Sequence, residues 1–118
     1  TAAAVALNAG VVTVDLRSPA TLTHGTDARK TQGSVMTLWS GNVERDQFLK
    51  YVGESNDRDP ILFAIGGSVP TNTITGYLPA DINLDGVVKY VGESNDRDPI
   101  LFNNGGSVPT NTRIEQLP

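Results

Sequence analysis

The sequence predicts a mostly β protein with short helices, in which a β-rich N-terminal part precedes two loop-plus-helix repeats. Lys50–Thr73 and Lys89–Thr112 are identical at all but two of 24 positions, at a shift of 39 residues. Apolar and polar residues alternate near the N-terminus, and each copy carries an Asp-Pro, an apolar turn and a Gly-Gly pair. We therefore expect three segments, 1–40, 41–79 and 80–118, packed as one compact unit.

The first 40 residues read as β structure. Val5–Leu7 precedes a turn at Asn8-Ala9-Gly10, and Val11–Leu16 alternates in the way that predicts a second strand. Arg17–Gly33 has no clear period and is rich in Pro, Thr, Gly and His, so we expect a long loop there. Ser34–Trp39 is then the third strand.

Each repeat is expected to hold one short helix. An Asp as the N-cap, a Pro at the first helical position and a Gly pair after the apolar turn fit the usual signals for the start and end of a helix. These residues are Asp59-Pro60 with Gly66-Gly67, and Asp98-Pro99 with Gly105-Gly106. Because Ala64-Ile65 becomes Asn103-Asn104, we expect the first helix to be more buried and the second to lie nearer the surface.

A loop with oxygen-bearing side chains at its first, third and fifth positions precedes each Lys-Tyr. The spacing is that of the opening of an EF-hand calcium loop, in which alternate side chains converge on one hard cation. The predicted ligands are the side chains of Asp81, Asn83 and Asp85 with the Val87 carbonyl, and those of Asn42, Glu44 and Asp46 with the Phe48 carbonyl. The full fold prediction is thus two EF-hand-like calcium loop plus short helix repeats after the β-rich part, with about two Ca²⁺ ions.

The closing ligand departs from the EF-hand pattern. Gly92 occupies the twelfth position, where a standard loop has a bidentate Glu, so the loop must be enlarged. Glu93, Asp96 and Asp98 are available, and we favour Asp96 or Asp98. The corresponding acids of the first copy are Asp57 and Asp59.

Ordinary turns are the alternative interpretation of these loops, because Asp, Asn and Gly form turns without metal. Two features favour calcium. The oxygen pattern recurs although the other loop letters have changed, and like charges this close repel by about 1–4 kcal/mol per pair unless something neutralises them. The first loop has Gln47 where the second has Gly86, so we leave open whether it binds metal.

The string DINLDGVVKYVGESNDRDPIL, followed by a near-copy of its tail and a terminal Leu-Pro, resembles C-terminal regions of large secreted or cell-surface proteins of Bacteroidota. These regions are often labelled hemagglutinin-like or dockerin-like. The resemblance covers residues 36–118 and implies duplicated calcium loops, each followed by a short helix. The longer repeat, the enlarged loop and the missing twelfth-position acid depart from dockerin, so the resemblance implies calcium binding more strongly than dockerin-type docking.

Composition narrows the function classes. The chain of 118 residues has a net charge of −4, no basic run and no Cys, which argues against a nucleic-acid partner and excludes disulfides. No apolar stretch approaches the roughly 20 residues that span a bilayer. His24 is the only His and lies in a Thr/Gly loop, so we expect no enzyme; a glycosidase-like carboxylate pair is the weaker alternative.

Two function hypotheses remain. The first is a calcium-stabilised structural or adhesive module, extracellular or on the cell surface, that associates with itself or with another surface protein. The start at Thr1 fits a matured subunit of a surface fibre, and equally an arbitrary numbering origin. The second is a docking module that binds a partner domain or a glycan. Its contact residues would be Tyr51, Tyr90, Val69-Pro70-Thr71-Asn72 and Val108-Pro109-Thr110-Asn111.

Overall fold

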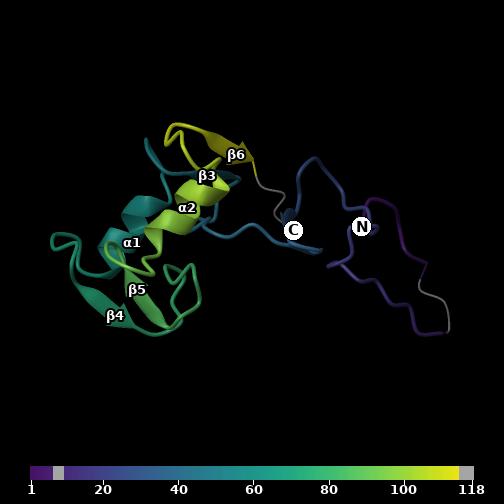
Figure 1. Cartoon of the computed structure of the whole chain (residues 1–118), viewed down its shortest axis with the longest axis horizontal. Helices are drawn as coiled ribbons and strands as arrows, with labels where there is room; N and C mark the ends of the chain where they lie inside the picture. The colour runs from purple at the N-terminus through teal and green to yellow at the C-terminus, as the bar shows by residue number, and fades with distance from the viewer. Residues whose placement is uncertain (7–9, 115–118) are drawn as a thin grey trace. The chain divides into compact units, whose positions relative to one another are not determined.

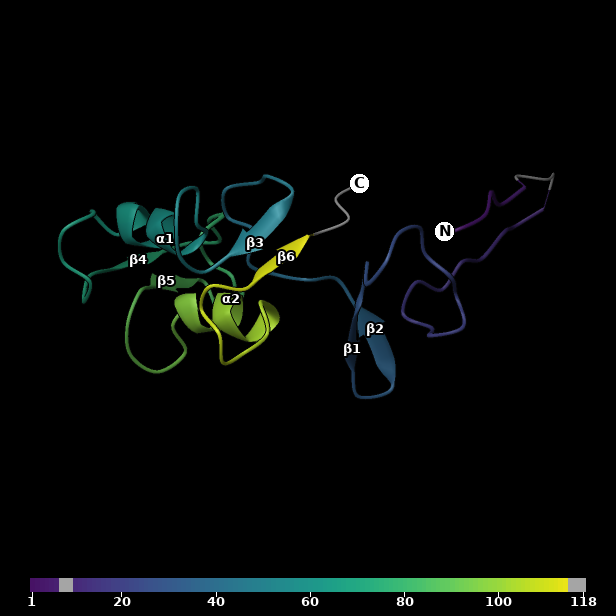
Figure 2. The same ribbon diagram turned by 90° about the horizontal axis from the view of Figure 1, so that it is seen from above.

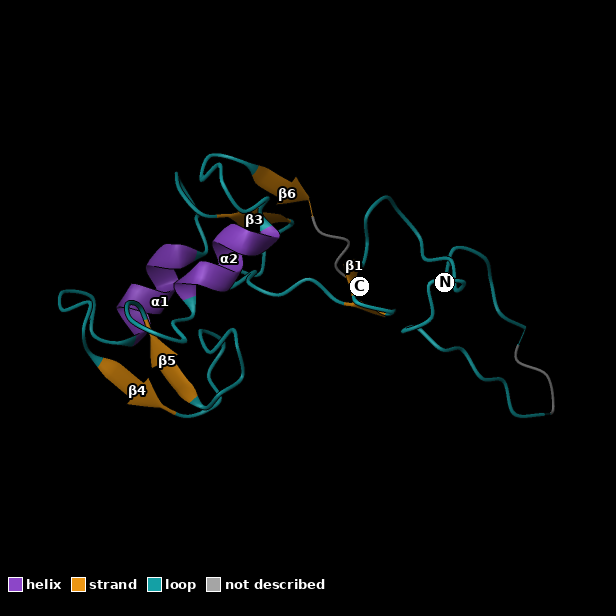
Figure 3. Cartoon of the chain, in the orientation of Figure 1, coloured by secondary structure: helices purple, strands orange, loops and turns teal. Residues whose placement is uncertain are grey.

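The computed structural model describes residues 1–6 and 10–114, which contain short strands in small antiparallel sheets and two short helices (Figure 3). This agrees with the coarse prediction of β structure with short helices. The chain divides into an N-terminal unit, Thr1–Trp39, and a repeat unit, Ser40–Ile114. Each unit is described separately below.

The N-terminal unit contains one hairpin. Strand β1 (Lys30–Gln32) pairs antiparallel with β2 (Val35–Thr37) across a turn at Gly33, whose φ is +60°. β2 lies within the third predicted strand, whereas β1 falls in the segment predicted as a loop. Val11–Leu16 contains no strand, so that prediction was wrong; alternation favours a strand only where a second strand supplies hydrogen bonds. The predicted strand at Val5–Leu7 lies partly outside the described residues.

The repeat unit has two halves related by the 39-residue period. The first half (residues 40–78) contains β3 (Phe48–Lys50), α1 (Arg58–Ala64) and β4 (Thr73–Thr75). The second half (residues 79–114) contains β5 (Val87–Lys89), α2 (Arg97–Asn103) and β6 (Thr112–Ile114). The two predicted helices are therefore both present, one in each half.

Strand pairing in the repeat unit runs between the halves. β3 of the first half pairs antiparallel with β6, and β4 pairs antiparallel with β5. Each helix likewise contacts a strand of the other half: α1 contacts β5, and α2 contacts β3. Figure 1 shows the two helices between the β3–β6 pair and the β4–β5 pair, and Figure 2 shows the same arrangement from above. In the repeat unit, each half therefore completes the sheets of the other.

A small apolar core lies between the halves. Its buried side chains are Leu49, Ile61, Ile65, Ala80, Val88 and Ile100. Leu49 and Val88 occupy equivalent positions on β3 and β5, as Ile61 and Ile100 do on the helices. Ala80 is equivalent to Gly41, where a Cβ would lie 3.0 Å from Leu49 Cδ1. In the second half the matching strand residue is Val88, which is smaller than Leu49. The smaller side chain leaves room for the Cβ of Ala80.

The helix starts differ from the prediction. Asp59 and Asp98 lie inside the first turn, because α1 begins at Arg58 and α2 at Arg97. Asn56 Oδ1 accepts from the Asp59 N–H (3.0 Å), and Asp59 Oδ2 accepts from the Asn56 amide (2.9 Å). Asn95 and Asp98 form the same two bonds, both at 2.9 Å. This reciprocal cap satisfies an N–H that the first turn leaves without an intrahelical partner.

The helix ends are as expected. The two Gly after α1 have φ of +111° and +80°, and the Gly67 N–H donates to the Leu62 carbonyl (2.8 Å), as in a Schellman end. The expected surface position of the second helix end was wrong. Asn103 and Asn104 are buried at 3% and 4% exposure. The Asn103 amide donates to the Ser40 carbonyl (2.8 Å) and hydroxyl (3.0 Å), so hydrogen bonds make its burial possible.

Candidate functional site

The second loop gathers three oxygen-bearing side chains around one stretch of backbone. The Asp85 N–H donates to both Asp81 Oδ1 (3.2 Å) and Asn83 Oδ1 (2.9 Å), so these two oxygens converge on the same nitrogen. The Gly86 N–H donates to Asp81 Oδ2 (2.9 Å), at a φ of +83° that favours glycine. Leu84 also has a positive φ, of +60°. This tight turn places the first, third and fifth loop positions together.

Asp81 is the most buried of these three residues, with 3% exposure. Among the described residues, no ion pair joins a Lys or Arg to Asp81 or Asp85. Two backbone N–H groups are the donors to the Asp81 carboxylate. A buried carboxylate without a cationic partner is costly, and a bound cation would remove that cost.

The first loop has a different hydrogen-bond pattern. The Asn42 amide donates to the Asp46 carbonyl (2.6 Å), and the Phe48 N–H donates to Asp46 Oδ1 (2.7 Å). Arg45 has the same left-handed backbone as Leu84, with φ of +59°, but Gln47 does not adopt the positive φ of Gly86. The Glu44 side chain is exposed. The two loops thus share the bend at the fourth position and differ at the sixth.

Asp57 and Asp96 have no solvent exposure and are fully engaged with the backbone. Asp96 Oδ1 accepts from the N–H groups of Ile82 (2.7 Å) and Asn83 (3.3 Å), and Oδ2 from that of Lys89 (2.7 Å). Asp57 accepts the three equivalent bonds in the first half, at 2.8 to 3.1 Å. Each carboxylate therefore ties a candidate calcium loop to the strand that follows it.

Opposing effects act on these two carboxyls. Burial raises the pKa of Asp96, the three N–H donors lower it, and the negative charge of Asp81 raises it further. The pKa of Asp57 is raised by burial in the same way, with Asp46 as the nearby negative charge. Asp81, at the first position of the second loop, and the buried Asp96 carboxylate are thus close enough to interact electrostatically.

The second acid of each pair lies in a more open place. Asp98 Oδ1 forms an ion pair with Arg97 Nη2 (3.5 Å), and its counterpart Asp59 pairs with Arg58 (3.3 Å). Asp98 and Asn83 both line an open hollow of about 360 Å³, together with Glu93, Ser94 and Phe102. The Asn83 amide also donates to the Ser94 carbonyl (2.9 Å), which closes the loop onto this segment. Asp98 therefore lines the same hollow as Asn83, whereas the Asp96 carboxylate is buried and fully engaged with backbone N–H groups.

The predicted carbonyl ligands begin strands. Val87 is the first residue of β5 and is opposite Thr75, and Phe48 begins β3 opposite Ile114. Within residues 1–6 and 10–114, no three Asp, Glu or His side chains form a metal-binding group by themselves. A calcium ion held by the second loop would therefore take Asn83, main-chain carbonyls and water besides the carboxylates, which is within the range of ligands that calcium accepts.

Sequence reasoning missed two residue types at the site. Asn56 and Asn95 hold the helix starts, and each amide also donates to a Gly carbonyl of the preceding loop (2.7 Å in both halves). The available signal was an Asn three residues before an Asp in both copies, which is a capping pattern. Ser40 was the second, and its contact with Asn103 spans 63 positions, so no local pattern could reveal it.

The tyrosines proposed to contact a partner are half-buried. Arg58 lies over the Tyr51 ring at 5.4 Å, and Arg97 over the Tyr90 ring at 5.3 Å. Both rings pack against the core. The two Val-Pro-Thr-Asn segments form turns, since the Asn72 N–H donates to the Val69 carbonyl and the equivalent bond recurs in the second half, both at 3.0 Å. These turns are exposed in the described structure.

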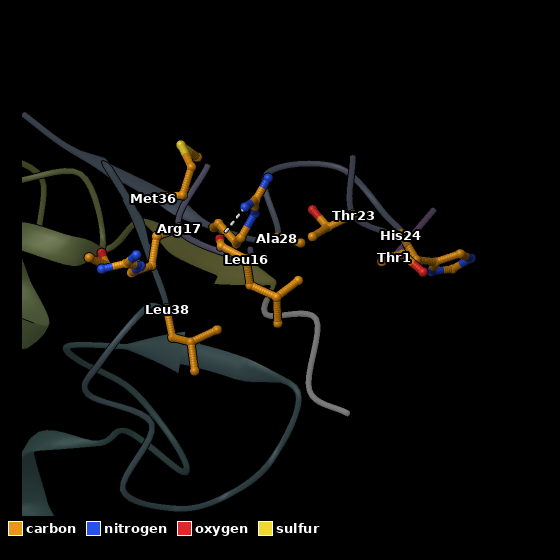
Figure 4. A pocket seen from close by; sticks show the side chains of 10 residues that line it. Thr1, Leu16, Arg17, Thr23, His24, Ala28, Met36 and Leu38 are labelled. Carbon is orange, nitrogen blue, oxygen red and sulfur yellow. Dashed lines mark hydrogen bonds between the residues drawn. The ribbon is translucent and has the colours of Figure 1, made fainter. Parts of the chain in front are cut away.

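The N-terminal unit has a separate hollow of about 810 Å³, lined by both apolar and polar side chains (Figure 4). Leu16, Met36 and Leu38 line it, and His24 lies at its edge as an exposed side chain. The Arg29 guanidinium donates to the Leu16, Ser18 and Thr21 carbonyls and so holds the preceding loop in place. Arg29 is thus a structural residue of this unit.

In the described part of the chain, neither helix has the length or apolar character needed to cross a membrane. Comparison of the chain with known family models, curated proteins and solved structures found no match.

Proposed function

We propose that this chain is a calcium-stabilised structural or adhesive module of the cell exterior. The observation that carries the proposal is the second loop, where Asp81, Asn83 and Asp85 converge on one turn without a Lys or Arg partner among the described residues. The proposed ion neutralises this charge. Because it binds the folded loop and not the unfolded chain, its binding free energy adds to stability.

Asp98 is the better candidate for the closing ligand. Asp96 already accepts three backbone N–H bonds, and turning it toward a metal would leave buried donors unsatisfied. Asp98 has an oxygen in a partly exposed ion pair, which is easier to exchange than three buried hydrogen bonds. In the first loop the proposed ligands are Asn42, Glu44, Asp46 and the Phe48 carbonyl, with Asp59 as the acid that closes it. Its Gln47 makes it the weaker of the two proposed sites.

Thermal unfolding with excess EDTA and then with millimolar calcium tests the proposal. Extracellular sites often have dissociation constants of about 10⁻⁴–10⁻³ M, so calcium at about 10 mM, roughly ten to a hundred times those values, should stabilise the fold by about 1.4–2.7 kcal/mol. We expect calcium to raise the Tm of the wild type and to raise it less in the Asp81→Asn/Asp85→Asn variant. Glu54→Gln, which removes an exposed acid of the first half, is the control for loss of surface charge and should respond like the wild type.

Terbium luminescence gives a second readout that does not depend on stability. The Tyr77 ring lies 3.7 Å from the position of a Cβ on Gly86, so it is placed to sensitise an ion held by the second loop. We expect Tyr77→Phe to weaken the terbium signal and leave the calcium-dependent Tm rise intact. Equal calcium responses in the wild type and the Asp81→Asn/Asp85→Asn variant, with no terbium signal, would reject the calcium site.

A docking module is the second candidate. It is supported by exposed apolar residues at equivalent positions of the two halves: Phe63 and Phe102 on the helices, and Val69 and Val108 in the turns. Matched exposed pairs of this kind suit a partner that contacts both halves. Phe63→Ala/Phe102→Ala should abolish capture of such a partner domain or glycan. Phe63→Ala alone should weaken capture and leave the calcium response of the second loop unchanged, because Phe102 and not Phe63 lines the hollow beside Asp98. Concentration-dependent growth of the chain alone would instead favour the structural role.

A further inference from the structure

The repeat unit is built like a dimer of its own halves. The strand exchange is reciprocal, since β3 pairs with β6 and β4 with β5, and each helix contacts a strand of the other half. Four of the six buried core residues form matched pairs, Leu49 with Val88 and Ile61 with Ile100. The surface that each half presents to the other is therefore nearly self-complementary, as in a two-fold interface.

Two of the differences between the halves create a side-chain hydrogen bond across this interface. The Asn103 amide of the second half donates to the carbonyl and hydroxyl of Ser40 in the first half. The equivalent positions are Ala64 and Pro79, neither of which has a side-chain hydrogen-bonding group. Pairing two second halves would place the buried Asn103 against Pro79 and lose the hydroxyl, and pairing two first halves would place Ala64 against Ser40. The pair Ser40–Asn103 thus favours a first half with a second half.

We propose that this interface is exchangeable between copies: the first half of one chain pairs with the second half of another, giving an assembly through a second copy of the chain. The segment that must open is Gly76–Ala80, between β4 and the second loop, which contains a Pro. All interactions within each pair of halves are retained, so the balance is set by concentration. A short linker gives an effective concentration on the order of millimolar, so the closed chain dominates at lower concentrations. The proposal does not rest on calcium binding.

Complementation between two damaged full-length chains tests the exchange. Ile61→Asp places a charge in the core of the first half, and Ile100→Asp does so in the second; both side chains are fully buried. We expect each variant alone to lack a cooperative unfolding transition. Refolded together at high concentration, they should form a dimer with one such transition, because the intact second half of one pairs with the intact first half of the other. A mixture that behaves as the sum of its components would overturn the exchange.

Asn103→Ala tests the choice of partner with an internal control. Placed on the Ile61→Asp chain, it removes the contact with Ser40 of the second copy. We expect dimer formation to need on the order of ten- to a hundredfold more protein. Placed on the Ile100→Asp chain, it falls in the damaged half and should change nothing. Equal effects on the two chains, or dimers formed by one variant alone, would overturn the role of the Ser40–Asn103 pair.

Phe63→Asp and Phe102→Asp serve as matched controls for the damaged chains. They introduce the same charge on the same helices, at side chains that are 75% and 69% exposed. Each should fold alone as a closed chain, and mixing them at low concentration should not change the particle size. A loss of folding in these controls would show that charge on the helix, rather than loss of a shared core, explains the first pair of variants, and would overturn the complementation argument.

Discussion

At the scale of the residue, Asp57 and Asp96 show how a buried carboxylate organises a loop by accepting hydrogen bonds. Burial raises the pKa of Asp96, so its negative charge is not what makes the site favourable. The gain comes from giving acceptors to three N–H groups that would otherwise be buried without partners. The acceptor geometry should then matter more than the charge.

This predicts a graded effect of substitutions at Asp96. Asp96→Asn keeps one acceptor oxygen and leaves one N–H unsatisfied, which costs about 1–3 kcal/mol of unfolding free energy. Asp96→Ala removes the acceptors of all three bonds and should cost clearly more. Urea unfolding in EDTA measures both, with Glu93→Gln as the exposed control, expected to be near wild type. Equal losses for Asn and Ala would show that the charge, and not the acceptor geometry, stabilises the loop.

At the scale of the element, the start of the first loop packs against β3 and α2. A Cβ on Gly41 would lie 3.0 Å from Leu49 Cδ1 and 3.3 Å from Ile100 Cγ1, and the φ of Gly41 is +114°. Gly53 has a similar φ of +99° but nothing within 4 Å of such a Cβ. An Ala at either position would therefore strain the backbone in the same way. Only at Gly41 would the added methyl group also crowd neighbouring side chains.

Gly41→Ala should accordingly lower the free energy of unfolding more than Gly53→Ala. The added difference is the cost of overpacking, typically about 1–3 kcal/mol. Chemical denaturation of both variants at the same pH measures it. Similar losses at the two positions would mean that Leu49 and Ile100 give way easily and that the junction is loosely packed.

The helices and their ends could be predicted from sequence because their signals are local. An apolar turn followed by Gly66-Gly67 has the same meaning wherever it occurs, and the structure places the end of α1 just before those residues. The strands could not be predicted so well, since β3 finds its partner β6 more than 60 positions away. Val11–Leu16 has the alternation of a strand, but in the described structure it pairs with no other strand.

The candidate site was predictable to the same extent. The convergence of Asp81, Asn83 and Asp85 follows from spacing alone, and the structure brings them together. The sequence could not predict that Asp96 accepts backbone N–H bonds while Asp98 pairs with Arg97. That difference depends on which N–H groups the folded loop turns toward each carboxylate. The burial of Asn103 likewise required Ser40, which lies in the other half.

At the scale of the whole repeat unit, the two halves share one core, so neither should unfold alone. Ile61 on α1 packs in the same cluster as Val88 on β5, and Ile100 on α2 in the same cluster as Leu49 on β3. Truncating the buried Ile of either helix therefore removes core contacts from both halves. This coupling is the same feature that makes exchange between copies possible.

Ile61→Ala and Ile100→Ala should each cost about 2–5 kcal/mol and still give a single unfolding transition. Amide hydrogen exchange should speed up at Val88 and at Leu49 in both variants, because global unfolding exposes both halves together. Phe63→Ala, at an exposed position of α1, should change neither. Two separate transitions, with only the mutated half losing protection, would contradict this prediction, since they would require each half to hold its sheet without the strand that the other supplies.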